Sequence, residues 1–345
     1  YLVDAYSWHK IFDVNVPVGV LAVLLAAFVQ KEWKNQTRSP FDWQGFAAIV
    51  LFMPLAIYAL ARGNSPSNPG GWSAPEVIGC FIVAGAALAW FIVAELRNPA
   101  PLLQIRLLAE RNFGISMAVL TLFAIGMLGG TYLLPLYMQR GLGYTALAAG
   151  SMFLPVGVIQ GVLSAVSGYL TRYVRPLLLS AAGILIMALS FWLASRFTLH
   201  TTHGHILFIL YLRGFGMGLT FAPLNLFSLK NLTQQDMAAA AGISNSIKQL
   251  AGSIGIALLT VIFSARTSYH AAHETVSAAQ TYVEGVTDAL RVVAVITLAA
   301  LLPLLGVFRK KRPGKSGVKG AATPSPGEAV SGKTDKTTIY RTKPE

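Results

Sequence analysis

Hydrophobic and polar positions alternate along this chain in long blocks, not residue by residue. Nine apolar runs, separated by short polar stretches, cover residues 11–29, 46–61, 76–94, 113–138, 147–168, 176–195, 205–228, 240–264 and 289–308. Most of them approach the roughly 20 residues that a helix needs to cross a bilayer. In lipid, a segment must satisfy its own backbone hydrogen bonds, and the runs lack the strict alternation of a membrane barrel. The pattern therefore predicts an all-α integral membrane protein with nine spans.

The first run shows how such a span begins. In WHKIFDVNVPVGVLAVLLAAF, which starts at Trp8, a polar and aromatic segment continues without a break into an apolar one. Trp8 suits the membrane interface, Asn15 suits a helix start, and Pro17 is tolerated in the first helical turns. The chain starts with Tyr and shows no signal-peptide pattern, so we expect it to be the later part of a longer protein.

Composition and charge support the membrane interpretation. Hydrophobic residues make up 54% of the 345 positions and charged residues only 12%, about half the usual share in a soluble domain. The net charge of +13 is unevenly placed: the loops of one side and the C-terminal tail hold 19 of the 27 Lys and Arg, and the other side holds five. By the positive-inside rule, Tyr1 is expected outside and the C-terminus in the cytoplasm. The basic charge thus has a topological cause, and no nucleic-acid partner is expected.

Two spans share a glycine and proline pattern. Gly126 to Leu136 reads GMLGGTYLLPL, and Gly214 to Leu224 reads GFGMGLTFAPL. Two independent small-residue packing faces would explain the pattern. An inverted repeat of three plus three helices is the alternative, because these spans open two successive triplets that run in opposite directions. The sequence leaves both explanations open.

Several motifs in the correct order resemble one transporter family. SWHKIFDVNVPVG, FDWQG, PLLQIRLLAERNF, LPLYMQRGLGYTALAAGSMFLPVG, LRGFGMGLTFAPL and AGISNSIKQLAGSIGIAL are similar to segments of the major facilitator superfamily's fourteen-helix drug:proton antiporters, the EmrB/QacA type. The resemblance covers Tyr1 to Phe308 and implies a partial major facilitator fold with helices six to fourteen. One segment departs from the family: GYLTRYVRP, Gly168 to Pro176, lacks the acidic residue usual in that loop.

The resemblance implies a division into four parts. Residues 1–29 would end an N-terminal bundle, residues 30–112 would hold two extra linker helices and connectors, and residues 113–308 would form a six-helix bundle. Residues 309–345 form a basic, polar tail that we expect to be a disordered cytoplasmic segment.

Candidate pathway residues follow from family architecture, which implies that four spans of the bundle face a central cavity. Their larger polar and polarisable side chains, together with two cations inside spans, are Tyr132, Met152, Gln160, Arg213, Met217, Phe221, Asn225, Asn245, Lys248 and Gln249. Residues with a structural or gating role would be Asn15, Pro17, Gly126, Gly130, Pro135, Pro155, Gly214, Gly218 and Pro223. Helix–helix packing alone would also account for most of the pathway candidates.

Two cationic residues lie inside the predicted spans. Arg213 and Lys248 each lie about a third of the way into a span, where a charge is costly unless paired or hydrated. We expect Arg213 to have a functional or bundle-stabilising role and Lys248 to extend toward the headgroups. Every acid is placed at an edge, loop or tail, with Asp288 at an outer span start and Glu284 outside. Proton-coupling acids are therefore expected in the absent helices.

Other function classes lack a sequence signature. The histidines of HTTHGH, His200, His203 and His205, have no acid or cysteine beside them, so a solvated loop is expected and no metal site. No phosphate-binding glycine loop, paired carboxylates or nucleophile constellation marks an ATPase or another enzyme. No cofactor is expected.

The expected function is a proton-coupled efflux antiporter of the inner membrane that exports amphipathic or cationic small molecules by alternating access, with the proton gradient as energy source. Its partners would be drug-like substrates, protons and membrane lipid, and in Gram-negative cells a periplasmic adaptor and an outer-membrane channel. The alternatives are a carrier of narrower specificity, for a siderophore, metabolite or basic amino acid, and a truncated, non-transporting membrane interaction protein.

Overall fold

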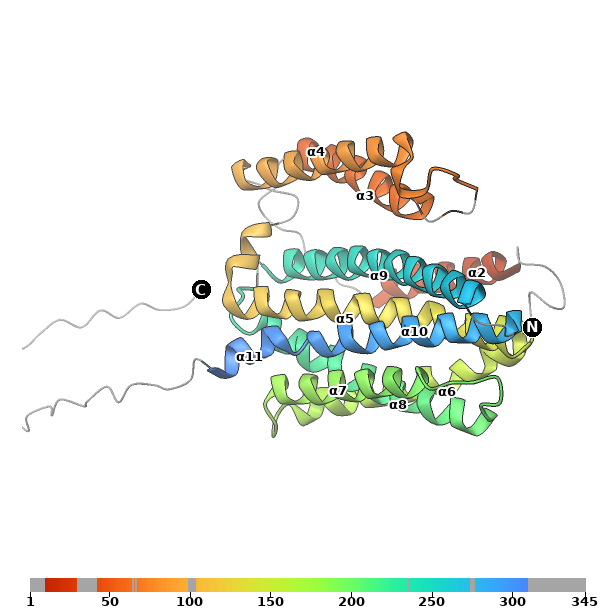
Figure 1. Cartoon of the computed structure of the whole chain (residues 1–345). Helices are drawn as coiled ribbons and strands as arrows, with labels where there is room; N and C mark the ends of the chain where they lie inside the picture. Colours follow the sequence, from red (N-terminus) through yellow and green to blue (C-terminus); the bar gives the residue numbers. More distant parts are fainter. Residues whose placement is uncertain are drawn as a thin grey trace, which may run out of the picture. The chain divides into compact units, whose positions relative to one another are not determined.

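The computed structural model describes residues 10–29, 42–63, 65, 67–98, 104–234, 236–273 and 277–309. All regular structure in these ranges is helical, as the apolar runs predict (Figure 1). The helices are α2 (Lys10–Val29), α3 (Trp43–Gly63), α4 (Pro75–Arg97), α5 (Arg111–Leu136), α6 (Ala146–Leu170), α7 (Pro176–Ala194), α8 (His203–Leu229), α9 (Met237–His273), α10 (Ala278–Ala299) and α11 (Leu302–Arg309). Trp8 and the predicted tail from residue 310 lie outside the described residues, and the predicted domain boundaries stay predictions.

Eight helices of the described chain are long and apolar enough to cross a membrane, and α2 contributes a shorter apolar segment, Asn15–Val29. The fold class predicted from the sequence, a partial all-α membrane fold, is thus confirmed. The described chain also contains three short elements: η1 (Gly71–Ser73), η2 (Ile105–Ala109) and the π-turn η3 (Tyr137–Gly141). We refer below to the two ends of the bundle by residues of α5 and η3, as the Arg111 end and the Arg140 end.

The predicted start of the last span was wrong. We expected it at residue 289, but α10 begins at Ala278, and α9 continues to His273. The Ser277 hydroxyl caps α10 by accepting a hydrogen bond of 3.2 Å from the Gln280 backbone N–H. Residues 281–288 are buried or half-buried in the bundle although Thr281, Glu284, Thr287 and Asp288 among them are polar, so their low mean hydropathy hides a regular helix. Asp288 and Glu284 consequently lie within a helix, not at its start or outside it.

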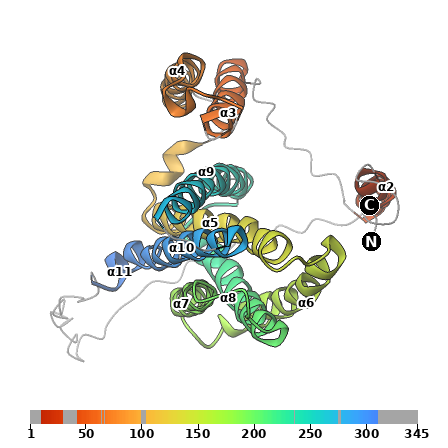
Figure 2. The same ribbon diagram turned by 45° about the vertical axis from the view of Figure 1, so that its right-hand side comes forward.

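The bundle pairs its helices in a symmetric way. α5 packs against α9 and α10, α8 packs against α6 and α7, and α7 also meets α10 (Figures 1 and 2). In an inverted repeat of α5–α7 and α8–α10, the pair α5 with α9 corresponds to the pair α8 with α6. This correspondence is what an inverted repeat requires, whereas the close contact of α9 with α10 has no equally close counterpart between α6 and α7.

The shared glycine pattern serves close packing between these helices. A side chain at Gly126 would meet Thr297 of α10, and one at Gly130 would meet the Phe191 ring of α7. On α8, a Cβ at Gly218 would lie 2.6 Å from the Cβ of Leu163 in α6. Both motifs thus provide surfaces without side chains where neighbouring helices approach, as small-residue faces do in membranes.

The two helices α3 and α4 form a hairpin closed by an ordered turn. Arg62 Nε and Glu76 Oε1 pair across the turn at 2.8 Å. The Asn68 side-chain amide donates to the carbonyls of Arg62 and Gly71, at 3.1 and 2.9 Å. Gly71 has φ +51°, a left-handed conformation that glycine adopts without strain. These contacts hold the two spans antiparallel without help from a large core.

Candidate functional site

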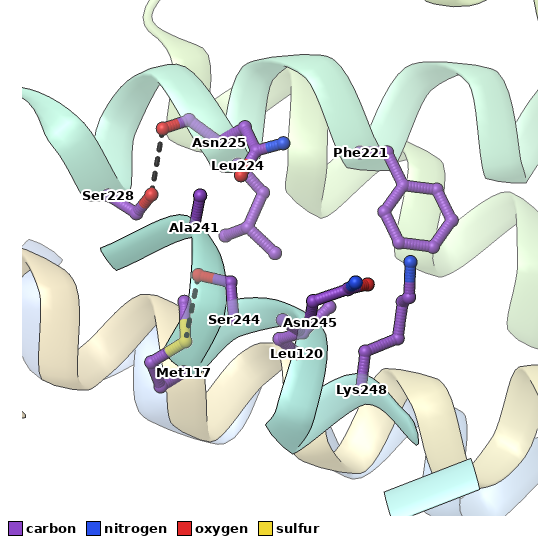
Figure 3. Close-up of a pocket in the computed structure, with 10 residues that line it drawn as sticks. All are labelled: Met117, Leu120, Phe221, Leu224, Asn225, Ser228, Ala241, Ser244, Asn245 and Lys248. Carbon is purple, nitrogen blue, oxygen red and sulfur yellow. Dashed lines mark hydrogen bonds between the residues drawn. The ribbon is translucent and has the colours of Figure 1, made fainter. Parts of the chain in front are cut away.

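A cavity of about 290 Å³ lies between α5, α8 and α9, in the half of the bundle nearer the Arg111 end (Figure 3). This volume is close to the lower limit of roughly 300 Å³ for small-molecule sites. The cavity is lined by Met117, Leu120, Phe221, Leu224, Asn225, Ser228, Ala241, Ser244, Asn245 and Lys248. Two consecutive helices, α8 and α9, and the distant helix α5 thus contribute to one site.

Helical periodicity explains which side chains reach the cavity. The lining positions of α8 are 221, 224, 225 and 228, and those of α9 are 241, 244, 245 and 248. Both sets follow the spacing i, i+3, i+4, i+7, which places residues on a single helix face. Each helix therefore presents one stripe to the cavity, and the two stripes face each other.

The polar groups of the cavity differ in what they offer a ligand. The hydroxyls of Ser228 and Ser244 donate to the backbone carbonyls of Asn225 and Ala240, at 2.8 and 2.7 Å. The side-chain amides of Asn225 and Asn245 make no hydrogen bond to another described residue, and each can both donate and accept. The two amides are therefore the groups best placed to orient a bound molecule.

Lys248 supplies the single charge among the side chains that line this cavity. Its half-buried side chain extends across the space toward the ring of Phe221 (Figure 3). Apart from Lys248 and the amides, the walls are mostly carbon and sulfur, from Met117, Leu120, Leu224 and Phe221. The arrangement suits a molecule with an apolar body and a polar group.

Arg213 lies deeper in the bundle and does not line this cavity. It is 2% exposed, and its guanidinium donates to the Thr131 hydroxyl and, at 3.5 Å, to the Met127 carbonyl, both on α5. Its guanidinium carbon is 5.8 Å from the centre of the Phe191 ring on α7. Within the described residues, its Nε and Nη1 have no hydrogen-bond partner. Arg213 thus connects α8 to two neighbouring helices at an electrostatic cost.

The comparison with known sequences decides the family. The sequence profile of the Major Facilitator Superfamily matches residues 1–256, well over half of the chain. The chain belongs to this superfamily. Among its relatives is the multidrug export protein EmrB of Escherichia coli K12, 32% identical over 80% of this chain and 54% of the relative.

Other relatives carry different names. The MFS-type transporter YhcA of Bacillus subtilis is 29% identical over 78% of this chain and 50% of its own length. The fatty acid resistance protein FarB of Neisseria gonorrhoeae is 28% identical over 77% of this chain and 52% of its own length. This chain thus spans about half the length of the curated relatives it matches. The major facilitator resemblance inferred from the motifs is confirmed.

Four of the ten pathway candidates line the cavity of this major facilitator chain: Phe221, Asn225, Asn245 and Lys248. The remaining six lie elsewhere. Met152 is buried in the core, Met217 packs against that core, and Gln160 is half-buried on α6. Tyr132 lines a separate space of about 480 Å³ beside α3, and Gln249 is exposed on α9. Their assignment to a substrate pathway stays a prediction.

The structural candidates fall into two groups. Asn15 and Pro17 lie in α2, and the glycines pack as described above. Pro135, Pro155 and Pro223 lie within α5, α6 and α8, where each removes one backbone donor from its helix. No moving element is visible in a single structure, so their role in gating stays a prediction.

Sequence reasoning missed several cavity residues, including Ser228, Ala241 and Ser244. Continuing one helical turn from Asn225 and Asn245 would have found them, but they were passed over because they are small. It also missed a group of charges at the Arg140 end. There Asp288 Oδ2 is 3.1 Å from His270 Nε2, and its Oδ1 accepts from Arg291 at 2.7 Å. This group joins α9 to α10 and lies away from the cavity.

Proposed function

We propose that the protein containing this chain exports amphipathic small molecules across the cell membrane in exchange for protons. The cavity between α5, α8 and α9 is the observation that carries this proposal. It combines apolar walls with the two amides of Asn225 and Asn245 and the cation of Lys248. Such a site offers a ligand both apolar contact and polar groups that can orient it.

The names of related proteins support export. Besides EmrB, the relatives include the lincomycin resistance protein LmrB of Bacillus subtilis, 25% identical over 76% of this chain. By this proposal the six-helix bundle forms one half of an alternating-access transporter. Its cavity would face a second bundle, and the cytoplasm would lie at the Arg111 end. A periplasmic adaptor and an outer-membrane channel would be partners where the cell has an outer membrane.

The charge of Lys248 affects which substrates the cavity can bind. Since Lys248 is the charged group of this wall, it repels a cation and attracts an anion or a polar acceptor. Neutral and anionic amphipathic molecules therefore fit the described wall better than the cations expected from the resemblance. A cationic substrate would need a carboxylate from outside the described residues. The same argument supports a second candidate function: a carrier with narrower specificity, for an acidic amphipathic compound.

Proton coupling needs a group that takes up and releases a proton. No acid of the described chain lines the cavity. We therefore assign the coupling acid to a part of the protein outside the described residues, because intramembrane acids in transporters mark the ion pathway.

Efflux from cells tests the proposal. The full-length protein is expressed in a bacterial strain that lacks its major exporters, and the cells are loaded with fluorescent amphipathic dyes that are anionic, neutral or cationic. We expect dye release that a protonophore abolishes. Asn245→Trp should block release by filling the cavity, whereas Leu298→Trp, on an exposed position of α10, should not. Release that is absent for every dye, or equal in the Asn245→Trp variant, would refute the proposed function.

A further inference from the structure

A second and larger cavity lies on the other side of α9. Its volume is about 540 Å³, and it is enclosed by the α3–α4 hairpin, the connector η2 and α9. Its lining residues are Ile49, Phe52, Met53, Leu88, Phe91, Ile92, Leu96, Ile105, Arg106, Leu108, Ala109, Ile243, Ser246, Ile247 and Leu250. We call this space the hairpin groove. It shares no residue with the cavity described above.

The groove walls are almost entirely hydrocarbon. Of the lining residues, only Arg106 and Ser246 carry a polar side chain. The walls come from α3, α4 and α9, which are all long and apolar enough to span a membrane. Water in such a space would find almost no hydrogen-bond partner. In a bilayer the groove is therefore filled by something apolar and elongated.

One cationic side chain, that of Arg106, lines the hairpin groove. Arg106 belongs to η2 and is exposed, and its Nη2 donates to the carbonyl of Leu96, in the last turn of α4. A guanidinium has five N–H donors, so this contact fixes its position and leaves most donors available. One neighbouring acid, Glu110, is already engaged: its carboxylate accepts from the Phe113 backbone N–H at 2.7 Å and from Asn231 at 3.0 Å.

The aromatic residues nearby indicate that this end lies at headgroup level. Trp43 and Trp90 are exposed, and they line an adjoining space together with Asp42 and Arg97. Exposed tryptophans on membrane-spanning helices concentrate at the boundary between hydrocarbon and water. The groove thus begins at the level of lipid phosphates and continues into the hydrocarbon layer.

We propose that the hairpin groove is a binding site for an anionic phospholipid of the surrounding bilayer. One acyl chain lies between the hairpin and α9, and the phosphate accepts hydrogen bonds from Arg106. Planar guanidinium groups bind phosphate oxygens through paired, charge-assisted hydrogen bonds. The lipid fills the space that separates the α3–α4 hairpin from the bundle and joins the two.

The chemistry of the groove argues against other occupants. An amphipathic cation would place its charge beside Arg106, which repels it. A further transmembrane helix, about 10 Å across with its side chains, does not fit into a space of about 540 Å³ between α3 and α9, which already contact each other. A free fatty acid shares the acyl chain and the negative charge, and the experiment below distinguishes it from a phospholipid.

The test measures lipids that stay bound to the purified protein. The full-length protein is extracted in mild detergent, and native mass spectrometry counts the molecules of phosphatidylglycerol, phosphatidylethanolamine and fatty acid retained per protein. We expect retained phosphatidylglycerol on the wild type. Arg106→Gln should lower its affinity roughly tenfold, the usual effect of losing a hydrogen bond to a charged group. Arg172→Gln replaces an exposed arginine that does not line the groove and serves as the matched control.

A second variant tests the acyl chain separately. Ile247→Trp fills the groove and should abolish retention, whereas Leu189→Trp, on an exposed position of α7, should leave it unchanged. Melting curves test whether each variant is folded. If Ile247→Trp misfolds, Arg106→Gln decides the question alone, because Arg106 is exposed and its substitution should not disturb the fold. Equal retention by wild type and Arg106→Gln would overturn the proposal, as would retention of fatty acid alone. Dye efflux plays no part in this readout, so it stands apart from the proposed function.

Discussion

The guanidinium carbon of Arg213 on α8 lies 5.8 Å from the centre of the Phe191 ring on α7, while the same guanidinium donates to Thr131 on α5. One side chain thus links α8 to two other helices of the bundle's core. It does so without a carboxylate partner among the described residues, and it is 2% exposed. The volume of the Arg213 side chain and its hydrogen bonds should stabilise the folded protein, whereas the burial of its charge should destabilise it.

Substitutions of Arg213 separate these two effects. Arg213→Ala should lower the free energy of unfolding by about 2–4 kcal/mol, since it leaves a void between the three helices. Arg213→Met keeps most of the volume and removes the buried charge, so it should cost clearly less. Thermal unfolding of the purified full-length variants in detergent measures the difference. If Arg213→Met is as damaging as Arg213→Ala, the hydrogen bonds of the guanidinium outweigh its burial cost.

Lys248 should control substrate charge and not stability. Lys248→Gln removes the cation that lines the cavity while keeping a similar length. We expect a several-fold fall in the export of anionic dyes relative to cationic ones, because the electrostatic attraction in the cavity is lost. The ratio of the two efflux rates, at matched membrane expression, is the quantity to measure. An unchanged ratio would mean that Lys248 does not face the substrate.

The contact between α7 and α8 depends on glycine. A Cβ at Gly216 would lie 2.8 Å from the Met187 nitrogen and 2.9 Å from the Gly183 carbonyl oxygen. Gly216→Ala should therefore force the two helices apart and cost roughly 1–3 kcal/mol. Gly204→Ala is the control on the same helix, because nothing lies within 4 Å of its Cβ. Equal melting temperatures for the two variants would contradict the packing described.

Asp288 should stabilise the pair α9 and α10. Its carboxylate meets His270 at 3.1 Å, Arg291 at 2.7 Å and Arg266 at 3.8 Å, and its side chain is 16% exposed. Asp288→Asn should lower the free energy of unfolding by about 1.5–3 kcal/mol, as expected for hydrogen bonds to charged groups. Glu284→Gln is the comparison, since its carboxylate lies 3.0 Å from the Gln280 amide and a longer 3.6 Å from His270 Nδ1. A larger effect from Glu284→Gln would show that the group is centred on the other carboxylate.

Sequence patterns predicted the spans well wherever a helix is apolar on all sides. They failed at residues 278–288, where polar residues such as Thr281, Thr287 and Asp288 are buried or half-buried within a helix of the bundle. Four of the ten cavity residues, Phe221, Asn225, Asn245 and Lys248, were predicted from the family resemblance and their positions in the spans. The hairpin groove could not be predicted, because it depends on how Phe52, Arg106 and Ile247 meet from three separate segments.

The most direct test of the account is transport by the purified full-length protein in liposomes under an imposed pH gradient. An anionic amphipathic dye is placed on one side, and its movement is followed by fluorescence with and without the gradient. The account predicts dye transport that requires the gradient, that Asn245→Trp abolishes and that Leu298→Trp leaves intact. Dye movement that does not depend on the pH gradient, or that persists in Asn245→Trp, would contradict export through the cavity between α5, α8 and α9.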